Sequence, residues 1–151
     1  MHRVLIPVWN KKMSDRQRQL IAEQVKKARA DEILLTFPRV LRNPIALEEQ
    51  IALFTENKQA LEGMGICVNA WLAPTMGYGG TGVKFEFDHD ADETYTRIKH
   101  LNGKLLYSYC PLDNAFTDDF IRTVKAICST GVRFILFEDD FTISGGKSYD
   151  F

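Results

Sequence analysis

Three consecutive carboxylates, Glu138, Asp139 and Asp140, directly follow the apolar run "FILF" at positions 134–137. Crowded carboxylates favour keeping one member protonated at neutral pH, which general acid catalysis requires. Glycoside cleavage uses such an acid together with a second carboxylate on the other side of the sugar. Successive strand residues point to opposite faces, so we expect Glu138 and Asp140, but not Asp139, to share a side. These three residues are the candidate catalytic groups.

Two other interpretations of this acidic cluster stay open. Asp139 and Asp140 could be oxygen ligands for Mg²⁺ or Ca²⁺ in a metal-dependent hydrolase, with Glu138 as the base. The chain could instead be a noncatalytic carbohydrate-binding or assembly module. A purely structural interpretation also stays open, in which Trp71 belongs to the core and Glu138 or Asp139 pairs with Arg39 or caps a turn. The preferred interpretation assigns neither a metal site nor a cofactor.

Strand and helix patterns alternate before this cluster. The strand-like runs "RVLIPVW", "EILLTFP" and "GICVNAWL" begin near residues 3, 33 and 66, a spacing that is typical of βαβ units. Between them, Ser14 and Gln17 form a capping box, and Asn43 with Pro44 predicts an N-cap followed by a first-turn proline. The continuous apolar character of the runs favours a parallel sheet covered by helices.

The pattern changes after Leu72, where about forty residues precede the next helix. Asn102 and Gly103 lie between two strand-like runs and predict an antiparallel hairpin. We expect a last helix to open at Thr117, and "VRFILF" to form the fourth strand of the main sheet. The sequence therefore predicts one α/β domain over residues 1–151, a parallel (β/α)4 half of a TIM barrel with a β-hairpin excursion after the third strand. Since a complete barrel needs about 250 residues, we expect the N-terminal part of a larger barrel, two copies that complete one another, or an open sheet.

Polar and aromatic residues follow each of the first three strands. Parallel strands bring their carboxyl ends to one edge, where ligands bind in barrels and open α/β sheets. Indoles can stack on sugar rings while amides, a guanidinium and acids bind hydroxyl groups. The candidate substrate-binding residues at this edge are Trp9, Asn10, Arg39, Asn69 and Trp71.

The net charge, the composition and the remaining motifs argue against several classes of function. A net charge of −1 without a basic run argues against nucleic acid as a partner, and no segment predicts a membrane span or a signal peptide. "GYGGTG" at 77–82 fits a dinucleotide motif but precedes a strand-like run rather than a helix, and "DHDADE" at 88–93 lacks the glycine and glutamate of a calcium loop. The three scattered cysteines indicate reduced thiols. We expect a cytoplasmic protein, or a secreted one whose leader has been removed.

The order of elements resembles the N-terminal half of the glycoside-hydrolase-like (β/α)8 barrels. "CPLDNAF" before a helix, followed by "GVRFILFEDDF", is similar to the fourth unit of poorly characterised bacterial members. The resemblance covers most of the chain and is specific over positions 110–141. It implies that Glu138, at the end of strand four, is the acid/base and that a carboxylate ending strand seven is the nucleophile. This chain has Phe137 where the clan usually has asparagine, and its 151 residues include no strand seven, so we expect it to be inactive alone.

The predicted half-barrel also has consequences for assembly. Its first and fourth strands are apolar by pattern and would present unpaired edges and an uncovered inner layer. We therefore expect a homo-oligomer, or a missing C-terminal half-barrel, as the protein partner alongside a carbohydrate ligand.

Overall fold

The structure is a computed structural model that describes residues 4–37, 39–72, 95–99, 103 and 105–137 of the 151-residue chain, without the side chains of residues 105–108. Its elements, in chain order, are β1 (Leu5–Val8), α1 (Asp15–Lys27), β2 (Glu32–Phe37), α2 (Pro44–Gly63), β3 (Cys67–Leu72), β4 (Arg97–Lys99), β5 (Leu105–Tyr109), α3 (Asn114–Ser129) and β6 (Ile135–Phe137).

Four of the strands form a parallel sheet in the order β1-β2-β3-β6. Leu35 of β2 pairs with Ala70 of β3, and Ala70 pairs in turn with Ile135 of β6. Each new strand is thus added on the same side of the preceding one, and right-handed crossovers then place every connecting helix on one face. The predicted α/β class with a parallel sheet is confirmed, and "VRFILF" contributes a strand of only three residues.

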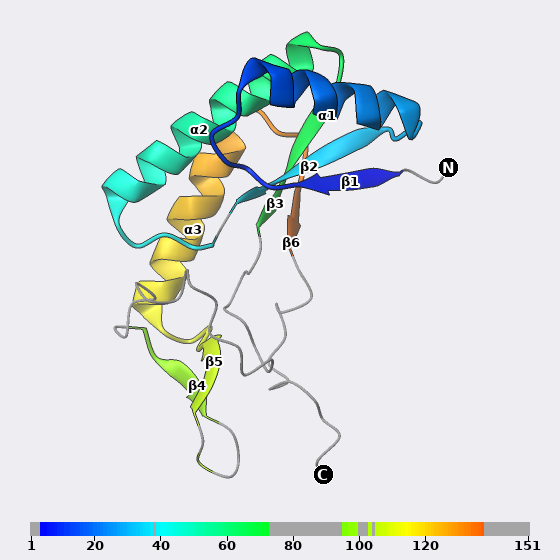
Figure 1. Ribbon diagram of the computed structural model, residues 1–151. Coiled ribbons are helices and arrows are strands. Elements are labelled where there is room, and N and C mark those ends of the chain that lie inside the picture. Colours follow the sequence, from blue (N-terminus) through cyan, green and yellow to red (C-terminus); the bar gives the residue numbers. More distant parts are fainter. Residues whose placement is uncertain (1–3, 38, 73–94, 100–102, 104, 138–151) are drawn as a thin grey trace, which may run out of the picture.

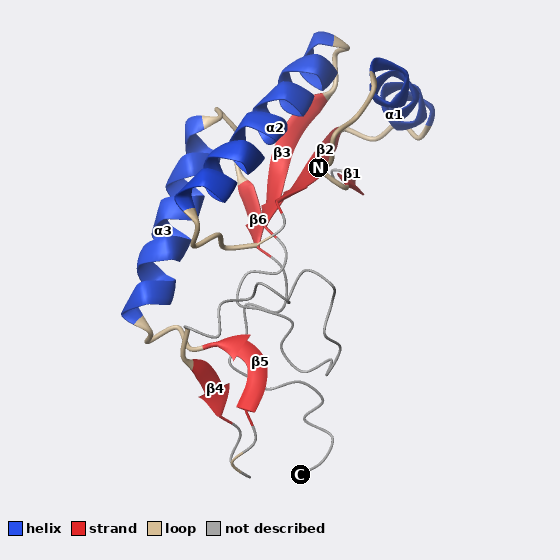
Figure 2. Ribbon diagram, turned by 60° about the vertical axis from the view of Figure 1, so that its left-hand side comes forward, coloured by secondary structure: helices blue, strands red, loops and turns tan. Residues whose placement is uncertain are grey.

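One apolar core fills the space between the sheet and the helices. Alternate strand residues, including Ile33, Leu35 and Phe37 of β2, join Phe54 of α2 and Ile127 of α3 in a single buried cluster. Figures 1 and 2 show the three helices on the same side of the sheet. Burying these side chains supplies most of the favourable free energy of folding, at about 25 cal/mol per Å² of apolar surface.

Local side-chain contacts set the starts of the helices. Ser14 and Gln17 make the predicted capping box at α1, and the Asn43 side chain accepts hydrogen bonds from the first turn of α2 ahead of Pro44. The prediction that the last helix opens at Thr117 is wrong. Asp113 is the N-cap of α3, because its carboxylate accepts a hydrogen bond from the backbone N–H of Phe116, three residues along.

The strands β4 and β5 form a separate antiparallel pair, in which Arg97 lies opposite Tyr109. Gly103, which the sequence placed in the turn, has a φ of +87°, a conformation that favours glycine, while Asn102 lies outside the described residues. A second buried cluster of Val40, Tyr95, Tyr109 and Phe116 connects this pair to α3 and to the segment after β2. Figures 1 and 2 show β4 and β5 beyond the carboxyl ends of the main strands.

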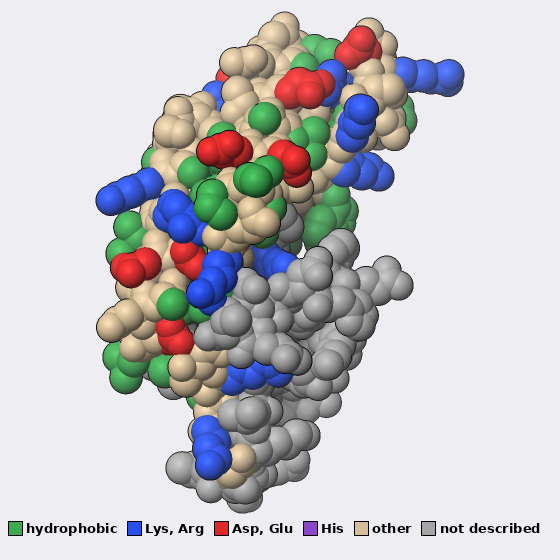
Figure 3. All heavy atoms as spheres, turned by 90° about the vertical axis from the view of Figure 1, so that its left-hand side faces the viewer, with side chains coloured by type: hydrophobic (Ala, Val, Ile, Leu, Met, Phe, Trp, Pro, Cys, Tyr) green, Lys and Arg blue, Asp and Glu red, His purple; other side chains and the backbone are tan. Residues whose placement is uncertain are grey.

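The outer surface of the helices carries both signs of charge. In Figure 3 acidic and basic side chains are interspersed over the face that α2 and α3 form, and neither sign gathers into one patch. Among the described residues, no helix has the length and apolar character that crossing a membrane requires.

Candidate functional site

The three acids that the sequence singled out, Glu138, Asp139 and Asp140, lie outside the described residues. They follow Phe137, the last residue of β6, which pairs with Leu72 of β3 and whose ring lies 5.8 Å from that of Phe120. Other residues at the carboxyl edge of the sheet lie within the described part of the chain.

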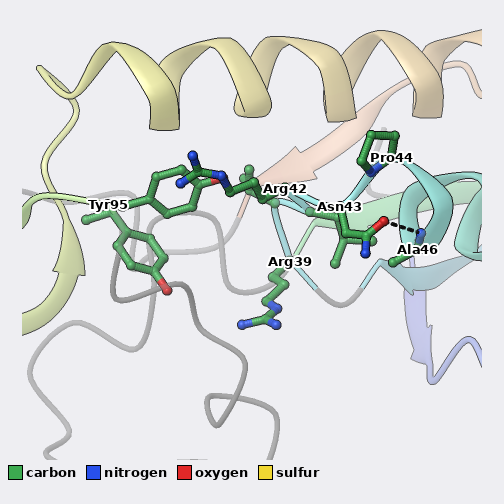
Figure 4. Close-up of a pocket in the computed structure, with 9 residues that line it drawn as sticks. Arg39, Arg42, Asn43, Pro44, Ala46 and Tyr95 are labelled. Carbon is green, nitrogen blue, oxygen red and sulfur yellow. Dashed lines mark hydrogen bonds between the residues drawn. The ribbon is translucent and has the colours of Figure 1, made fainter.

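A cavity of about 580 Å³ opens at this edge, beyond the end of β2. It is lined by the segment that joins β2 to α2, by Tyr95, which precedes β4 (Figure 4), and by Tyr109, the last residue of β5. We call it the edge cavity. Its described lining residues are Arg39, Val40, Leu41, Arg42, Asn43, Pro44, Ala46, Tyr95 and Tyr109.

Hydrogen bonds to α3 hold the floor of the edge cavity in place. The guanidinium of Arg122 donates to the carbonyl oxygens of Leu41 and Arg42, at 3.0 and 2.6 Å. The hydroxyl of Thr123, which is fully buried, accepts from the backbone N–H of Leu41. The β2–α2 segment is thus held in place by side chains that are about eighty residues away in sequence.

Aromatic side chains form the opposite wall. The ring of Tyr95 lies 5.0 Å from that of Tyr109 and 5.5 Å from that of Phe116, both edge-on. The hydroxyl of Tyr95 donates to the buried carboxylate of Asp119, which also pairs with Arg122 at 2.8 Å. The pair of Asp119 and Arg122 on α3 therefore contacts both the floor and the tyrosine wall.

Asp113 links the wall to the start of α3. Its carboxylate accepts a hydrogen bond of 2.6 Å from the backbone N–H of Thr96 and another of 3.1 Å from that of Phe116. These bonds, the one from Thr96 above all, stabilise the charged form and lower the pKa of Asp113 from 3.8 to about 2.

The two arginines of the edge cavity differ in their contacts. The guanidinium of Arg42 lies 5.4 Å from the centre of the Tyr95 ring, a cation–π arrangement. Arg39 is partly buried, and within the described part of the chain it makes no hydrogen bond and no ion pair. Figure 4 shows the Arg39 side chain extending away from the Arg42–Tyr95 pair.

Trp9 and Asn10 follow β1, and only the indole is exposed. Trp9 is 64% exposed and borders a second hollow of about 300 Å³ together with Leu20 and Ile21 of α1. The Asn10 side chain accepts a hydrogen bond of 2.8 Å from Asn57 of α2, while its own amide nitrogen is buried and has no partner among the described residues.

Trp71 lies on the helix-free face of the sheet, in register with Thr36. The Thr36 hydroxyl accepts from the backbone N–H of Asn10, so Thr36 connects Trp71 of β3 with the segment that follows β1. The indole nitrogen of Trp71 is buried without a hydrogen-bond partner in the described structure. Such a group is a candidate donor for a ligand or a water molecule.

Asn69 lies elsewhere. It is fully buried and donates to Glu32 at the start of β2, while its carbonyl oxygen accepts from the backbone N–H groups of Arg133 and Phe134. Arg133 completes the group through an ion pair of 2.7 Å with Glu32, a contact that raises the pKa of Arg133. We call Glu32, Asn69 and Arg133 the amino-end cluster, since they lie near the opposite edge from the cavity.

The predicted residues are thus distributed over several places. Arg39 lines the edge cavity and Trp9 the smaller hollow, whereas Asn10, Asn69 and Trp71 are not among the described residues that line either. Sequence reasoning missed Arg42, Tyr95 and Tyr109. The "TYTRIKH" and "KLLYSYC" runs contained both tyrosines, but nothing in them indicated which part of the main sheet they approach.

Within the residues that the structure describes, no group of three or more His, Cys, Asp or Glu side chains could hold a metal ion. No protein-family model matches the sequence, and no curated protein is significantly similar to it.

Proposed function

We propose that this chain is a carbohydrate-binding α/β domain of the glycoside-hydrolase-like kind, whose ligand lies at the carboxyl edge of the parallel sheet. The observation that carries the proposal is the edge cavity, because parallel α/β folds bind ligands at the carboxyl ends of their strands. Its volume of about 580 Å³ is in the usual range for small-molecule sites.

The lining of the edge cavity supports a sugar as ligand. Tyrosine rings offer apolar surface with a polar edge, and Arg39 offers donors for hydroxyl oxygens. The exposed Trp9 and the unpartnered indole nitrogen of Trp71 add aromatic surface and a donor near the same edge of the sheet. These residue types together suit polyhydroxylated rings better than purely apolar ligands.

Hydrolysis is the second part of the proposal. Glu138 is the acid/base by resemblance, and Asp139 and Asp140 lie beside it in the sequence. A retaining or inverting mechanism needs a second carboxylate across the scissile bond. In the proposed half-barrel that group comes from a C-terminal half or from a second copy of the chain. The sequential strand order with helices on one face is compatible with such a half-barrel.

Ligand-detected and protein-detected NMR with a panel of oligosaccharides tests the binding site. The expected result is a set of amide shift changes at residues 39–46 and 95–99. Ala46→Trp, which fills the edge cavity, should abolish these changes. Ala52→Trp is the matched control, because Ala52 is an exposed residue of the same helix away from the cavity. Saccharide binding that survives Ala46→Trp would contradict the proposed site.

Turnover is measured separately with aryl glycosides. The purified chain is expected to show no hydrolysis above background, because in the proposed half-barrel the second carboxylate comes from outside these 151 residues. Robust turnover that Glu138→Gln abolishes would refute the need for a second half while keeping the role of the acid. Metal-dependent turnover, lost with chelator, would instead favour a metal-dependent hydrolase.

A further inference from the structure

We infer that the edge cavity selects an acidic saccharide, a sugar ring that carries a carboxylate or phosphate group held by Arg39. This inference rests on the proposed function and specifies its ligand. It follows from the charge of the described cavity lining, from the absence of a partner for Arg39 among the described residues, and from the contacts that Arg42 and Asn43 already make.

The described lining of the edge cavity carries charge of one sign only. Its described lining includes two arginines, Arg39 and Arg42, and no aspartate or glutamate. Asp119, the acid that Tyr95 of the wall contacts, is already paired with Arg122. The described walls therefore present net positive charge to any occupant, and a concave site concentrates that field.

Arg39 differs in its contacts from Arg18, the buried arginine of the described structure. Arg18 contacts Asp15, Glu56 and Asn57. Arg39 is also partly buried, yet within the described residues it has no counter-ion and no acceptor. Partial removal from water costs free energy unless an oxyanion or another acceptor replaces it, so the ligand is the natural source of that acceptor.

The groups around Arg39 attract an oxyanion through their charge but do not occupy the place beside its guanidinium. Arg42 packs on the Tyr95 ring, and so contributes charge from a fixed position. The first turn of α2 faces the cavity at Pro44 and Ala46, and the positive end of the helix dipole adds to the field there. The side-chain oxygen of Asn43 already accepts from the backbone N–H groups of Ile45 and Ala46, so these N–H groups are not open to an oxyanion and the charged contact falls to the guanidinium of Arg39.

The chemistry of the guanidinium specifies the ligand group. Arginine binds carboxylates and phosphates through two parallel hydrogen bonds, which fixes orientation as well as affinity. Neutral hydroxyl groups accept only single, weaker bonds. The edge cavity is therefore suited to a uronide or a sugar phosphate, with the ring against the tyrosine wall and the oxyanion at Arg39.

Isothermal titration calorimetry on the 151-residue chain tests this inference. The probes are trigalacturonide and triglucuronide, their methyl esters as neutral counterparts, a hexose phosphate, and inorganic phosphate. The acids should bind at least tenfold more tightly than their esters at 20 mM salt, and less tightly at 200 mM salt. Arg39→Gln should remove the preference for the acid. Arg16→Gln, at an exposed position of α1 with the same change in net charge, should leave it unchanged.

The possible results separate failure of this inference from failure of the proposed function. Equal binding of acid and ester, unchanged by Arg39→Gln, would overturn the inference and leave saccharide binding intact. Absence of binding by every saccharide would overturn both the inference and the proposed function. Binding of hexose phosphate but not uronides would identify phosphate as the anionic group. Inorganic phosphate binding as tightly as hexose phosphate would show that the ring contributes nothing, and so contradict an acidic saccharide.

Discussion

The polar side chains at the two edges of the parallel sheet differ in whether they have hydrogen-bond partners. At the amino end, Glu32, Asn69 and Arg133 satisfy one another's hydrogen-bonding groups. At the carboxyl end, Arg39 has no partner in the described structure, and the indole nitrogen of Trp71 is buried without an acceptor. Buried polar groups that are hydrogen-bonded help to specify a unique fold. Buried polar groups without a partner cost stability and are expected where a protein has a function. The difference therefore separates polar residues that stabilise the sheet from polar residues that are candidates for contact with the proposed ligand.

The largest effect is expected from breaking the satisfied edge. Asn69→Leu leaves the Glu32 carboxylate and the N–H groups of Arg133 and Phe134 without their amide partner, and should lower the free energy of unfolding by about 3 kcal/mol. Urea denaturation followed by tryptophan fluorescence measures the loss. A loss below about 1 kcal/mol would show that the amino-end cluster is not structural.

A double variant sharpens the same test. Removing both partners with Glu32→Leu and Asn69→Leu leaves Arg133, whose side chain is 56% exposed, able to turn to water. The combined loss should be smaller than the sum of the two single losses, because the variants share one interaction. Strict additivity would contradict the coupling between the two residues.

Asn57 tests whether satisfied groups also support the carboxyl end. Its side chain is fully buried, donates to Asn10 and to the carbonyl oxygen of Lys11, and accepts from Arg18. Asn57→Leu should cost about 2 kcal/mol and shift the fluorescence of Trp9, because the segment after β1 loses its anchor. Unchanged stability together with unchanged emission would show that other contacts hold this segment.

The contribution of the Asp113 carboxylate to stability is expected to depend on pH. Its pKa is about 2 in the folded protein, below the ordinary 3.8, so its contribution is present above about pH 4 and is lost as the pH falls towards 2. Asp113→Asn keeps an N-cap of similar strength but removes the charge. The difference in stability between the two proteins should therefore shrink from pH 4 to pH 2 in urea titrations. A constant difference over this range would contradict the role of the charge.

The smallest effect on stability is expected at the cavity. Arg39→Gln removes a side chain without a described partner, so the free energy of unfolding should change by less than about 0.5 kcal/mol. Thermal and urea denaturation measure this value. A loss comparable to that of Asn69→Leu would show that Arg39 is structural and would remove the contrast between the two edges.

Local patterns were enough to predict much of the main sheet and two of the helix starts. The capping box at Ser14 and the Asn43–Pro44 pair act within one turn, so the sequence alone reveals them. The start of α3 was predicted wrongly because Thr117, Asp118 and Asp119 imitate a helix start. The actual cap, Asp113, is distinguished by its additional bond to Thr96, which comes from a distant segment.

The site was harder to predict for the same reason. Arg39 could be placed at the carboxyl edge from its position after a strand. Asn69 was predicted at the same edge from its strand, but its partner Glu32 depends on the register between β2 and β3, which places Glu32 opposite Cys67. The tyrosine wall depends on how the β4–β5 pair packs against α3, and no local spacing encodes that packing.

The proline in β1 has a consequence for how copies of this molecule meet. The carbonyl of Val4 accepts from β2, so alternation directs the backbone groups of Leu5 and Pro7 to the outer edge of the strand. Pro7 has no N–H to donate, so a strand docking there would lose a rung of its ladder. This edge is therefore a poor template for open-ended, fibril-like stacking, and crowding in the cell should promote association through side-chain surfaces sooner than through backbone extension at β1.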